Sequence, residues 1–347
     1  MQQNVPLAQL TTIGIGGPAR WFVRAQSFEQ LREALAWAKQ RGVPVFVLGG
    51  GSNLLIADGG FDGLVVQIGL RGIEVVTSGE HVLVKAAAGE PWDEFVAHTV
   101  SRGWAGIECL SGIPGMVGAT PIQNVGAYGQ EVCQTITSVD ALDRVTGELR
   151  TFSNADCRFS YRNSFFKSEA PDRYIVLSVT FRLTPGGSAR IAYPELQRYV
   201  EEHRIEARDL PAVREAVIAI RRRKGMVIDP ADPDTRSNGS FFVNPILTPQ
   251  ALEAFRQRAA EAGIAEFPQY PCPEGVKLSA AWLIERSGFN KGFALGNAGL
   301  SSKHTLAIIN RGGATARDVI ELVRLIQARV RERFGVELQP EPNFVGF

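Results

Sequence analysis

The sequence is poor in the residues that build metal sites and disulfide frameworks. It has four cysteines and four histidines among 347 residues, and no two cysteines form a CxxC pair. This spacing argues against a zinc site and against a redox dithiol. It favours four reduced thiols that pack as small apolar groups. The cysteines are Cys109, Cys133, Cys157 and Cys272.

Excess charge of one sign and long apolar runs are also missing. The 37 basic and 36 acidic side chains leave a net charge of +1, which argues against a protein that coats nucleic acid. No segment approaches the roughly 18 apolar residues of a membrane helix. The first residues show neither the basic region nor the apolar core of a signal peptide. We therefore expect a cytoplasmic protein with neither a nucleic-acid nor a membrane partner.

What is present has the composition of an ordinary globular enzyme. Hydrophobic residues make up 45% and charged residues 21% of the chain, and the length suits two or three domains. Apolar residues at helical spacing predict helices, and short β-rich runs predict strands. Helices are expected at 28–42, 91–103, 211–223, 249–263, 278–287 and 314–335, and strands at 44–51, 64–69, 74–79, 81–89 and within 136–183. The order predicts an α+β region to about residue 205 and a second α+β region after it.

A first glycine cluster ends the strand expected at 44–51. Backbone N–H groups without neighbouring Cβ atoms can form an anion-binding nest, to which serine and asparagine side chains add donors. A pyrophosphate suits such a nest, although a plain strand-to-turn connection also explains the glycines. The residues of this segment are Gly49, Gly50, Gly51, Ser52, Asn53 and Leu54.

A second segment, at 104–130, is rich in glycine and proline and has little regular pattern. Residues 110–130 carry no charge, which is unusual for an exposed loop and predicts burial against a ligand. Glycines let the backbone lie flat on a planar or charged group, and amide and phenol side chains offer hydrogen bonds. The positions predicted to line a cofactor are Gly112, Ile113, Pro114, Gly115, Gly118, Ala119, Gln123, Asn124, Gly126, Ala127, Tyr128 and Gly129.

A third glycine segment, GIGGPA at 14–19, fits the spacing of a dinucleotide-binding fingerprint. That fingerprint needs a strand before the glycines and a helix that opens at them. Residues 1–13 show no clear strand, and residues 18–21 run into an apparent strand. We therefore reject a Rossmann site here.

Six segments resemble one family, in the order expected of it. They are TIGIGGPAR, VLGGGSNLLI, LSGIPGMVGATPIQNVGAYGQEV, FSYRNSFFK, RSNGSFFVNP and LQPEPNFVGF, and they resemble the UDP-N-acetylenolpyruvoylglucosamine reductases over nearly the whole chain. The resemblance implies an α+β fold with an FAD-binding region of the vanillyl-alcohol-oxidase (PCMH) type at 1–205, in subdomains of about 1–67 and 68–205. It implies a substrate-binding domain at 206–347, whose last residues return to the active site. IAYPEL (191–196) resembles the tyrosine loop of the family's longer, first subtype.

The implied reaction reduces UDP-N-acetylenolpyruvoylglucosamine to UDP-N-acetylmuramate in peptidoglycan precursor synthesis. Hydride adds to the terminal vinyl carbon, negative charge grows on the adjacent carbon and its carboxylate, and an acid protonates that carbon. No side chain delivers hydride, so a flavin is needed. The resemblance implies non-covalent FAD, with NADPH as co-substrate, and we expect a monomer.

Three residues resemble the catalytic set of that family. Arg162, in SYRNS, matches the arginine whose planar fork pairs with the substrate carboxylate. Ser240, in NGSFF, matches the proton donor, and Glu341, in QPEPNF, matches a glutamate that polarises the same end of the substrate. Such a glutamate is expected to be protonated or arginine-paired, with a raised or coupled pKa. Taken singly, each residue type is more typical of an ion pair, a turn or a solvated carboxylate. Their joint order supports the assignment.

The resemblance also suggests contacts to the nucleotide sugar and to FAD. Cationic and hydroxyl side chains suit a diphosphate. The matching positions are Tyr161, Tyr193, Lys224, Asn244 and Lys277 for the substrate, and Arg221 for the flavin. The run RRRK at 221–224 is equally typical of a solvated helix end.

The chain departs from the family pattern in three places. The connection at 225–238 is longer, Val243 stands where lysine is common, and Ala294 replaces a glutamine seen in some members. Two other functions compete with the reductase. A flavin oxidase would share the glycine clusters, but not the NGSFF serine together with the terminal glutamate. A non-enzymatic nucleotide-binding module would leave the catalytic set unexplained.

Overall fold

The computed structural model describes residues 1–347, which form two compact units. Unit 1 comprises Met1–Asn4, Arg20–Gly50 and Gly63–Val227, and unit 2 comprises Val5–Ala19, Gly51–Asp62 and Ile228–Phe347. Both units mix helices with mainly antiparallel sheets, so the α+β fold class is confirmed. None of the helices combines the length and the apolar character needed to cross a bilayer.

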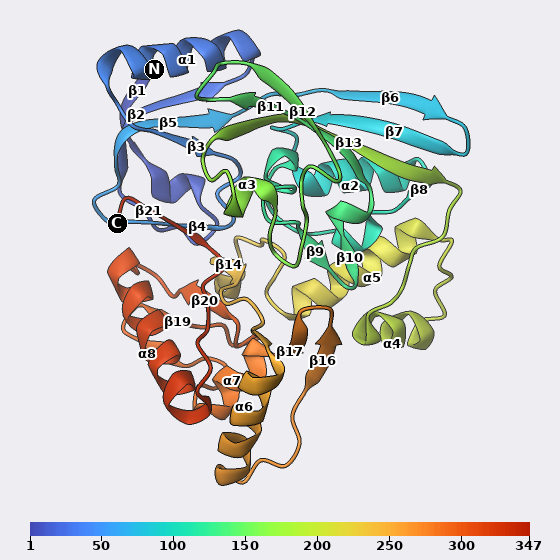
Figure 1. The fold of residues 1–347 in the computed structure, drawn as a ribbon, viewed down its shortest axis with the longest axis vertical. Coiled ribbons are helices and arrows are strands. Elements are labelled where there is room, and N and C mark those ends of the chain that lie inside the picture. Colours follow the sequence, from blue (N-terminus) through green and yellow to red (C-terminus); the bar gives the residue numbers. More distant parts are fainter. The chain divides into compact units, whose positions relative to one another are not determined.

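The first sheet, most of which belongs to unit 1, has the strand order β1-β2-β5-β3 (Figure 1). Its strands are β1 (Gln2–Pro6), β2 (Pro18–Ala25), β5 (Phe61–Ile68) and β3 (Val45–Leu48), and β3 runs parallel to β5. Helix α1 (Phe28–Arg41) begins where the Ser27 side chain accepts a hydrogen bond from the Gln30 amide, and it ends at Gly42 in a left-handed conformation. These caps explain why the predicted helix at 28–42 is confirmed.

The second sheet of unit 1 has the order β12-β11-β13-β7-β6, with β8 paired to β13. Its strands are β6 (Ile73–Ser78), β7 (His81–Ala87), β8 (Trp104–Ala105), β11 (Ile136–Asp143), β12 (Leu149–Ser153) and β13 (Tyr174–Pro185). Helix α2 (Trp92–Ser101) packs on it through the rings of Trp92, Phe95 and Phe181, whose centroids lie 5.1–5.9 Å apart. This contact anchors the chain just before the glycine-rich segment.

The glycine-rich segment itself is held in short turns rather than in long elements, as predicted. It contains the two-residue strands β9 (Gly126–Ala127) and β10 (Gln130–Glu131) and short 3-10 turns. The remaining helices of unit 1 are α3 (Phe165–Ser168), α4 (Pro194–Glu202) and α5 (Leu210–Arg223). Helix α4 was not predicted, because Pro194 is typical of a loop. The structure places this proline at the first helical position, where proline is favoured.

Unit 2 is built around a sheet of order β14-β20-β19-β18, against which α8 packs. Its strands are β14 (Ser237–Ser240), β18 (Ala294–Leu295), β19 (Ala298–Leu300) and β20 (Ala307–Asn310), and its helices are α6 (Pro249–Glu261), α7 (Ala280–Arg286) and α8 (Ala316–Phe334). A capping box of Thr315 and Asp318 begins α8, and left-handed Gly335 ends it. A small sheet adds β15 (Ile246–Leu247), β16 (Gln269–Cys272) and β17 (Gly275–Leu278).

Two details of the chain ends bear on the site. Residues 1–13 contain the strand β1, which the sequence analysis did not expect, but no helix opens at the glycines of 14–17, which lead into β2. The Rossmann site is therefore correctly rejected. Near the other end, β21 (Asn343–Val345) pairs in parallel with β4 (Leu54–Ile56). This pairing brings the last residues beside the first glycine cluster. The predicted boundary at about 67 divides the FAD-binding region into two subdomains and the one at 205 separates it from the substrate-binding domain, and both stay predictions.

Candidate functional site

The two glycine clusters singled out from the sequence meet inside unit 1. A Cβ atom on Gly50 would lie 2.7 Å from the Cα atom of Gly115, a distance that real side chains do not tolerate. The amide of Trp92 donates to the carbonyl of Gly115 at 3.0 Å, so the second cluster is fixed by the start of α2. The glycines are thus needed because one backbone lies directly on another.

The neighbours of Gly50 show two different reasons for glycine. On Gly49 a Cβ atom would meet only the Cβ of Ala119, at 3.9 Å, so a side chain here would project into open space. Gly51, within unit 2, has φ +65°, and its Cβ would lie 1.8 Å from the carbonyl oxygen of Leu10. Gly51 is therefore fixed by the protein itself, whereas Gly49 leaves room for a ligand.

Arg221 is a buried cation in the same region of unit 1. Its Nη2 donates to the carbonyl of Met226 at 2.9 Å, but its buried Nε has no hydrogen-bond partner. Burial lowers the pKa of Arg221, against the raising effects of Tyr128 and Asp93. A Cβ atom on Gly112 would lie 3.3 Å from this Nε. An unmade bond to a buried charged group is costly, so the arrangement fits a ligand that presents acceptor oxygens or nitrogens, as a flavin nucleotide does.

Asp93 organises this region, and the sequence analysis missed it. Arg214 of α5 donates to both carboxylate oxygens of Asp93, at 2.6 and 2.8 Å, and the amide of Gly112 donates to Oδ1 at 2.5 Å. Burial raises the pKa of Asp93, but the bonds from Arg214 and from Gly112 outweigh it and lower the pKa overall. Because Asp93 and Arg214 are 121 residues apart in sequence, no local pattern could have revealed the pair.

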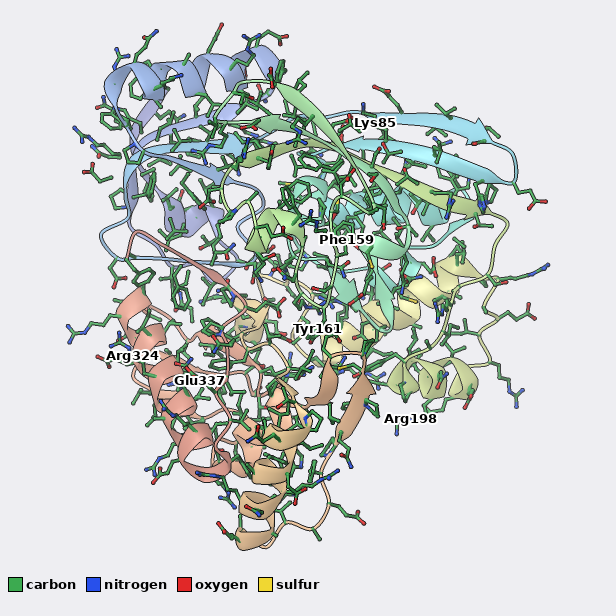
Figure 2. All side chains as sticks on the ribbon, in the orientation of Figure 1. Lys85, Phe159, Tyr161, Arg198, Arg324 and Glu337 are labelled. Atoms are coloured by element: carbon green, nitrogen blue, oxygen red, sulfur yellow. The ribbon has the colours of Figure 1, made fainter.

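The predicted catalytic Arg162 lies in a strained turn of unit 1. Its φ is +54°, in the left-handed region that is unfavourable for arginine. Its Nη2 donates to the carbonyl of Gly126 at 2.7 Å, and its guanidinium lies 5.3 Å from the ring centroid of Tyr161. Figure 2 labels Tyr161 on this segment, between β12 and α3. The carbonyl of Gly126 thus holds the guanidinium of Arg162 in place.

Asn124 connects the glycine-rich segment to this turn. Its amide nitrogen donates to the carbonyl of Ser160 at 3.0 Å and to Glu131 at 3.2 Å, and its amide oxygen accepts from the amide of Cys133 at 3.2 Å. Like Arg162, Asn124 and Tyr128 have positive φ, at +48° and +49°. The predicted role of Asn124 in cofactor binding stays a prediction, because these bonds tie its side chain to the protein.

Two predicted substrate contacts gather around Tyr128 in unit 1. The ring of Tyr128 meets that of Tyr193 edge-on at 5.6 Å, and the ammonium of Lys224 lies 5.9 Å from the Tyr128 centroid. Burial raises the pKa of Tyr128 to about 12, so the phenol stays neutral. Lys224 also pairs with Glu195 at 2.5 Å. The structure therefore brings Tyr193 and Lys224 to one place.

Unit 2 brings together Ser240, Glu341 and Asn53. Ser240 ends β14 opposite Ala307, after a register irregularity and after Gly239 with φ +72°. The amide of Glu341 donates to the carbonyl of Phe241 at 2.8 Å. The Asn53 side chain donates to the carbonyl of Glu341 at 3.2 Å. Three segments far apart in sequence thus meet, through one backbone–backbone bond and one bond from a side chain to the backbone.

Two other predicted substrate residues lie in unit 2, on and beside the small sheet. The side-chain oxygen of Asn244 accepts from the amide of Ala280, at the start of α7, at 2.9 Å, and Lys277 pairs with Ile246 in the sheet. Asn244 thus has a structural role at a helix terminus. Contacts from either residue to a substrate stay predictions.

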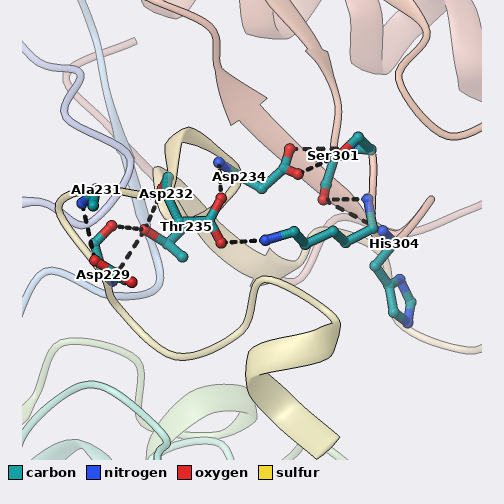
Figure 3. Close-up of polar contacts among 9 residues, drawn as sticks. Asp229, Ala231, Asp232, Asp234, Thr235, Ser301 and His304 are labelled. Carbon is teal, nitrogen blue, oxygen red and sulfur yellow. Dashed lines mark hydrogen bonds and ion pairs between the residues drawn. The ribbon is translucent and has the colours of Figure 1, made fainter.

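The long connection before Ser240 is a tightly bonded turn, shown in Figure 3. Asp234 accepts from the amide and the hydroxyl of Ser302, at 3.0 and 2.5 Å. Asp232 pairs with Lys303 at 2.5 Å, and this bond raises the pKa of Lys303. Thr235 bridges the carbonyls of Asp229 and Asp232, both at 2.8 Å. The extra residues give β14 a fixed starting point, and they do not form a loose loop.

Two family models match parts of the chain. Residues 19–153 match the model of an FAD binding domain, and residues 230–345 match the C-terminal domain of UDP-N-acetylenolpyruvoylglucosamine reductase. The reductase of that name from Thermobifida fusca is 49% identical over 99% of this chain and 98% of its own, and the one from Streptomyces coelicolor is 51% identical over 99% and 90%. The crystal structure of the Thermus caldophilus reductase covers 99% of this chain and 98% of its own, with a TM-score of 0.66 and 26% identity.

Gly49→Val is expected to weaken the binding of FAD while leaving the fold intact. The branched side chain would enter the open space beside Ala119, where the Cβ atom itself meets no other protein atom within 4 Å. Overpacking by one side chain costs about 1–3 kcal/mol, or roughly a ten- to hundredfold loss of affinity. Visible flavin absorbance and FAD titration measure the effect. Gly59→Val, at an exposed site where a Cβ meets nothing within 4 Å, is the control. A Gly49→Val protein as yellow as the wild type would place the cofactor elsewhere.

Asp93→Asn is expected to lower the free energy of unfolding by about 1 kcal/mol near neutral pH. The carboxylate is 40% exposed, and partly exposed ion pairs contribute little more than this to stability. A lowered native pKa means that the ionised carboxylate stabilises the fold above its unfolded pKa, near the ordinary value of 3.8. This contribution fades as the pH falls through the native pKa. Denaturant unfolding of both proteins between about pH 7 and 3 should show the difference shrinking in acid. A difference that grew in acid would contradict the role of Asp93.

Proposed function

Because the chain belongs to the UDP-N-acetylenolpyruvoylglucosamine reductase family, we propose that Arg162, Ser240 and Glu341 carry out its reaction. The chain is an FAD-dependent oxidoreductase that reduces the enolpyruvyl group of this nucleotide sugar with NADPH in peptidoglycan precursor synthesis. When bound, FAD supplies the hydride. The protein's own residues must bind the substrate, stabilise the charge that develops and deliver a proton.

Arg162 is proposed to bind the carboxylate of the enolpyruvyl group. A guanidinium can pair with a carboxylate through two parallel N–H donors, and the pairing strengthens as charge grows on the carboxylate. The bond from Nη2 to Gly126 and the ring of Tyr161 orient the guanidinium.

Ser240 is proposed to protonate the carbon next to that carboxylate, and Glu341 to polarise the same end of the substrate. The observation that supports this pairing best is the bond between the Glu341 amide and the Phe241 carbonyl, at 2.8 Å. It places the terminal glutamate beside the residue that follows Ser240. A serine needs no histidine partner here, because its proton acceptor is strongly basic.

The remaining assignments are proposed on the same basis. Residues 1–205 would bind FAD and residues 206–347 the substrate, with Tyr161, Tyr193, Lys224, Asn244 and Lys277 contacting the nucleotide sugar. The cationic Lys224 next to two phenol rings suits a diphosphate and a sugar. We propose that the enzyme is a cytoplasmic monomer.

A flavin oxidase is the alternative with the same cofactor. It would turn over with O₂ and would not consume NADPH. The meeting of the Ser240 and Glu341 segments in unit 2 favours the reductase, because an alcohol or hydroxy-acid oxidase has no use for a proton donor to a carbanion. Anaerobic addition of NADPH to the yellow protein separates the two, since only the reductase should bleach at once.

Ser240→Ala is expected to slow reoxidation of the reduced enzyme by the enolpyruvyl substrate by about 10²–10⁴-fold, the usual worth of general acid catalysis. The NADPH-driven bleaching should stay almost unchanged, because no proton from Ser240 is needed there. Ser240→Cys should retain more activity, since a thiol also carries a transferable proton. Anaerobic stopped-flow absorbance measures each half-reaction separately. Slowed bleaching with normal reoxidation would instead assign the NGSFF segment to the nicotinamide site.

Arg162→Lys is expected to slow the same substrate half-reaction and to spare bleaching by NADPH. Lysine keeps the charge but loses the two-pronged contact, so a loss of about 1.5–3 kcal/mol, roughly tenfold or more, is expected. The matched control is Arg158→Lys, four residues earlier, where the side chain is exposed and pairs with Glu169. Equal effects in both variants would show that the segment, and not the guanidinium of Arg162, determines the rate.

A further inference from the structure

One of the side chains proposed to bind the diphosphate already forms an ion pair within the protein. The ammonium of Lys224, at the end of α5, lies 2.5 Å from a carboxylate oxygen of Glu195, in the first turn of α4. The two side chains keep 27% and 33% of their surface exposed, so a ligand can reach both from solvent. The Tyr128 ring, next to Tyr193, borders the pair.

We propose that Glu195 competes with the substrate's diphosphate for Lys224, so that this ion pair must open when the nucleotide sugar binds. The inference rests on the proposed function, in which Lys224 binds that diphosphate. The ammonium is a compact point charge that the carboxylate already contacts. A diphosphate bound to the same ammonium would lie close to the Glu195 carboxylate, and like charges at such a distance repel.

Glu195 lies in the first turn of α4, and Tyr193 is the residue that precedes that turn. The bond from the Gln197 amide to the Tyr193 carbonyl, at 2.9 Å, holds the turn by its backbone. Opening the ion pair therefore requires only a movement of the Glu195 or Lys224 side chain. Ligands without phosphate leave the pair closed, so Glu195 lowers the affinity of diphosphate ligands alone and sets how strongly the site prefers them over uncharged ones.

The test is the affinity of the FAD-loaded protein for UDP, with uridine as the uncharged comparison. Glu195→Gln should tighten UDP binding about fivefold at low ionic strength, because it removes a competing charge in a partly exposed pair. The gain should shrink in about 0.5 M salt, where such interactions are screened. The affinity for uridine should not change. Isothermal titration calorimetry measures all these constants.

The matched control is Glu202→Gln, the same change of charge at the exposed far end of α4. It should leave UDP affinity unchanged. An unchanged or weaker affinity for UDP in Glu195→Gln would overturn the competition, and a weaker one would make Glu195 a residue that positions Lys224. A wild-type protein that does not bind UDP would contradict the proposed substrate itself. The two failures are therefore distinguishable.

Discussion

The contact between the backbones of Gly50 and Gly115 is the constraint on which the cofactor region depends. A Cβ on Gly50 would lie 2.7 Å from the Gly115 backbone, so neither segment could hold its place with side chains in between. This close contact joins the end of β3 and the turn at Gly115, which are distant in sequence, into one surface. The open side of that surface, beside Gly49 and Ala119, is then available to a ligand. Glycine serves here as a packing residue as well as a flexible one.

Buried charge and left-handed backbone also occur in this unit. Asp93 holds the amide of Gly112 and is itself held by Arg214, while buried Arg221 keeps one donor without a protein partner. Asn124, Tyr128 and Arg162 have left-handed backbone. Buried donors and strained turns are destabilising in isolation. Their presence together is typical of a site whose geometry is completed by what it binds.

Helices and strands with strong local sequence signals were predicted correctly. Elements without such signals were missed. Ser27 with Gly42, and Thr315 with Gly335, are local caps, and both helices were predicted. Strand β1 was missed because its residues are mostly exposed and carry no alternation of burial. Helix α4 was missed because a proline looked like a loop signal.

The site shows the same division between local and tertiary signals. The glycine clusters and the proposed catalytic set could be singled out from motifs. The Asp93–Arg214 pair could not, because it joins residues 121 positions apart. The pairing of Lys224 with Glu195 depends on the packing of two helices, which no single motif encodes. Motifs therefore indicated the candidate reacting groups, whereas the pairs that hold the surrounding segments in place appear only in the structure.

The parallel pairing of β21 with β4 has a consequence for how the protein is made. The ribosome produces Asn53 and β4 early, but the carbonyl that Asn53 binds belongs to Glu341, 288 residues later. Until that residue emerges, unit 2 lacks both its terminal glutamate and the strand that covers β4. Completion of this part of unit 2 is therefore a late event of biosynthesis. Chains cut short before Glu341 would keep most of the apolar core of unit 2 and still lack the carbonyl that Asn53 binds.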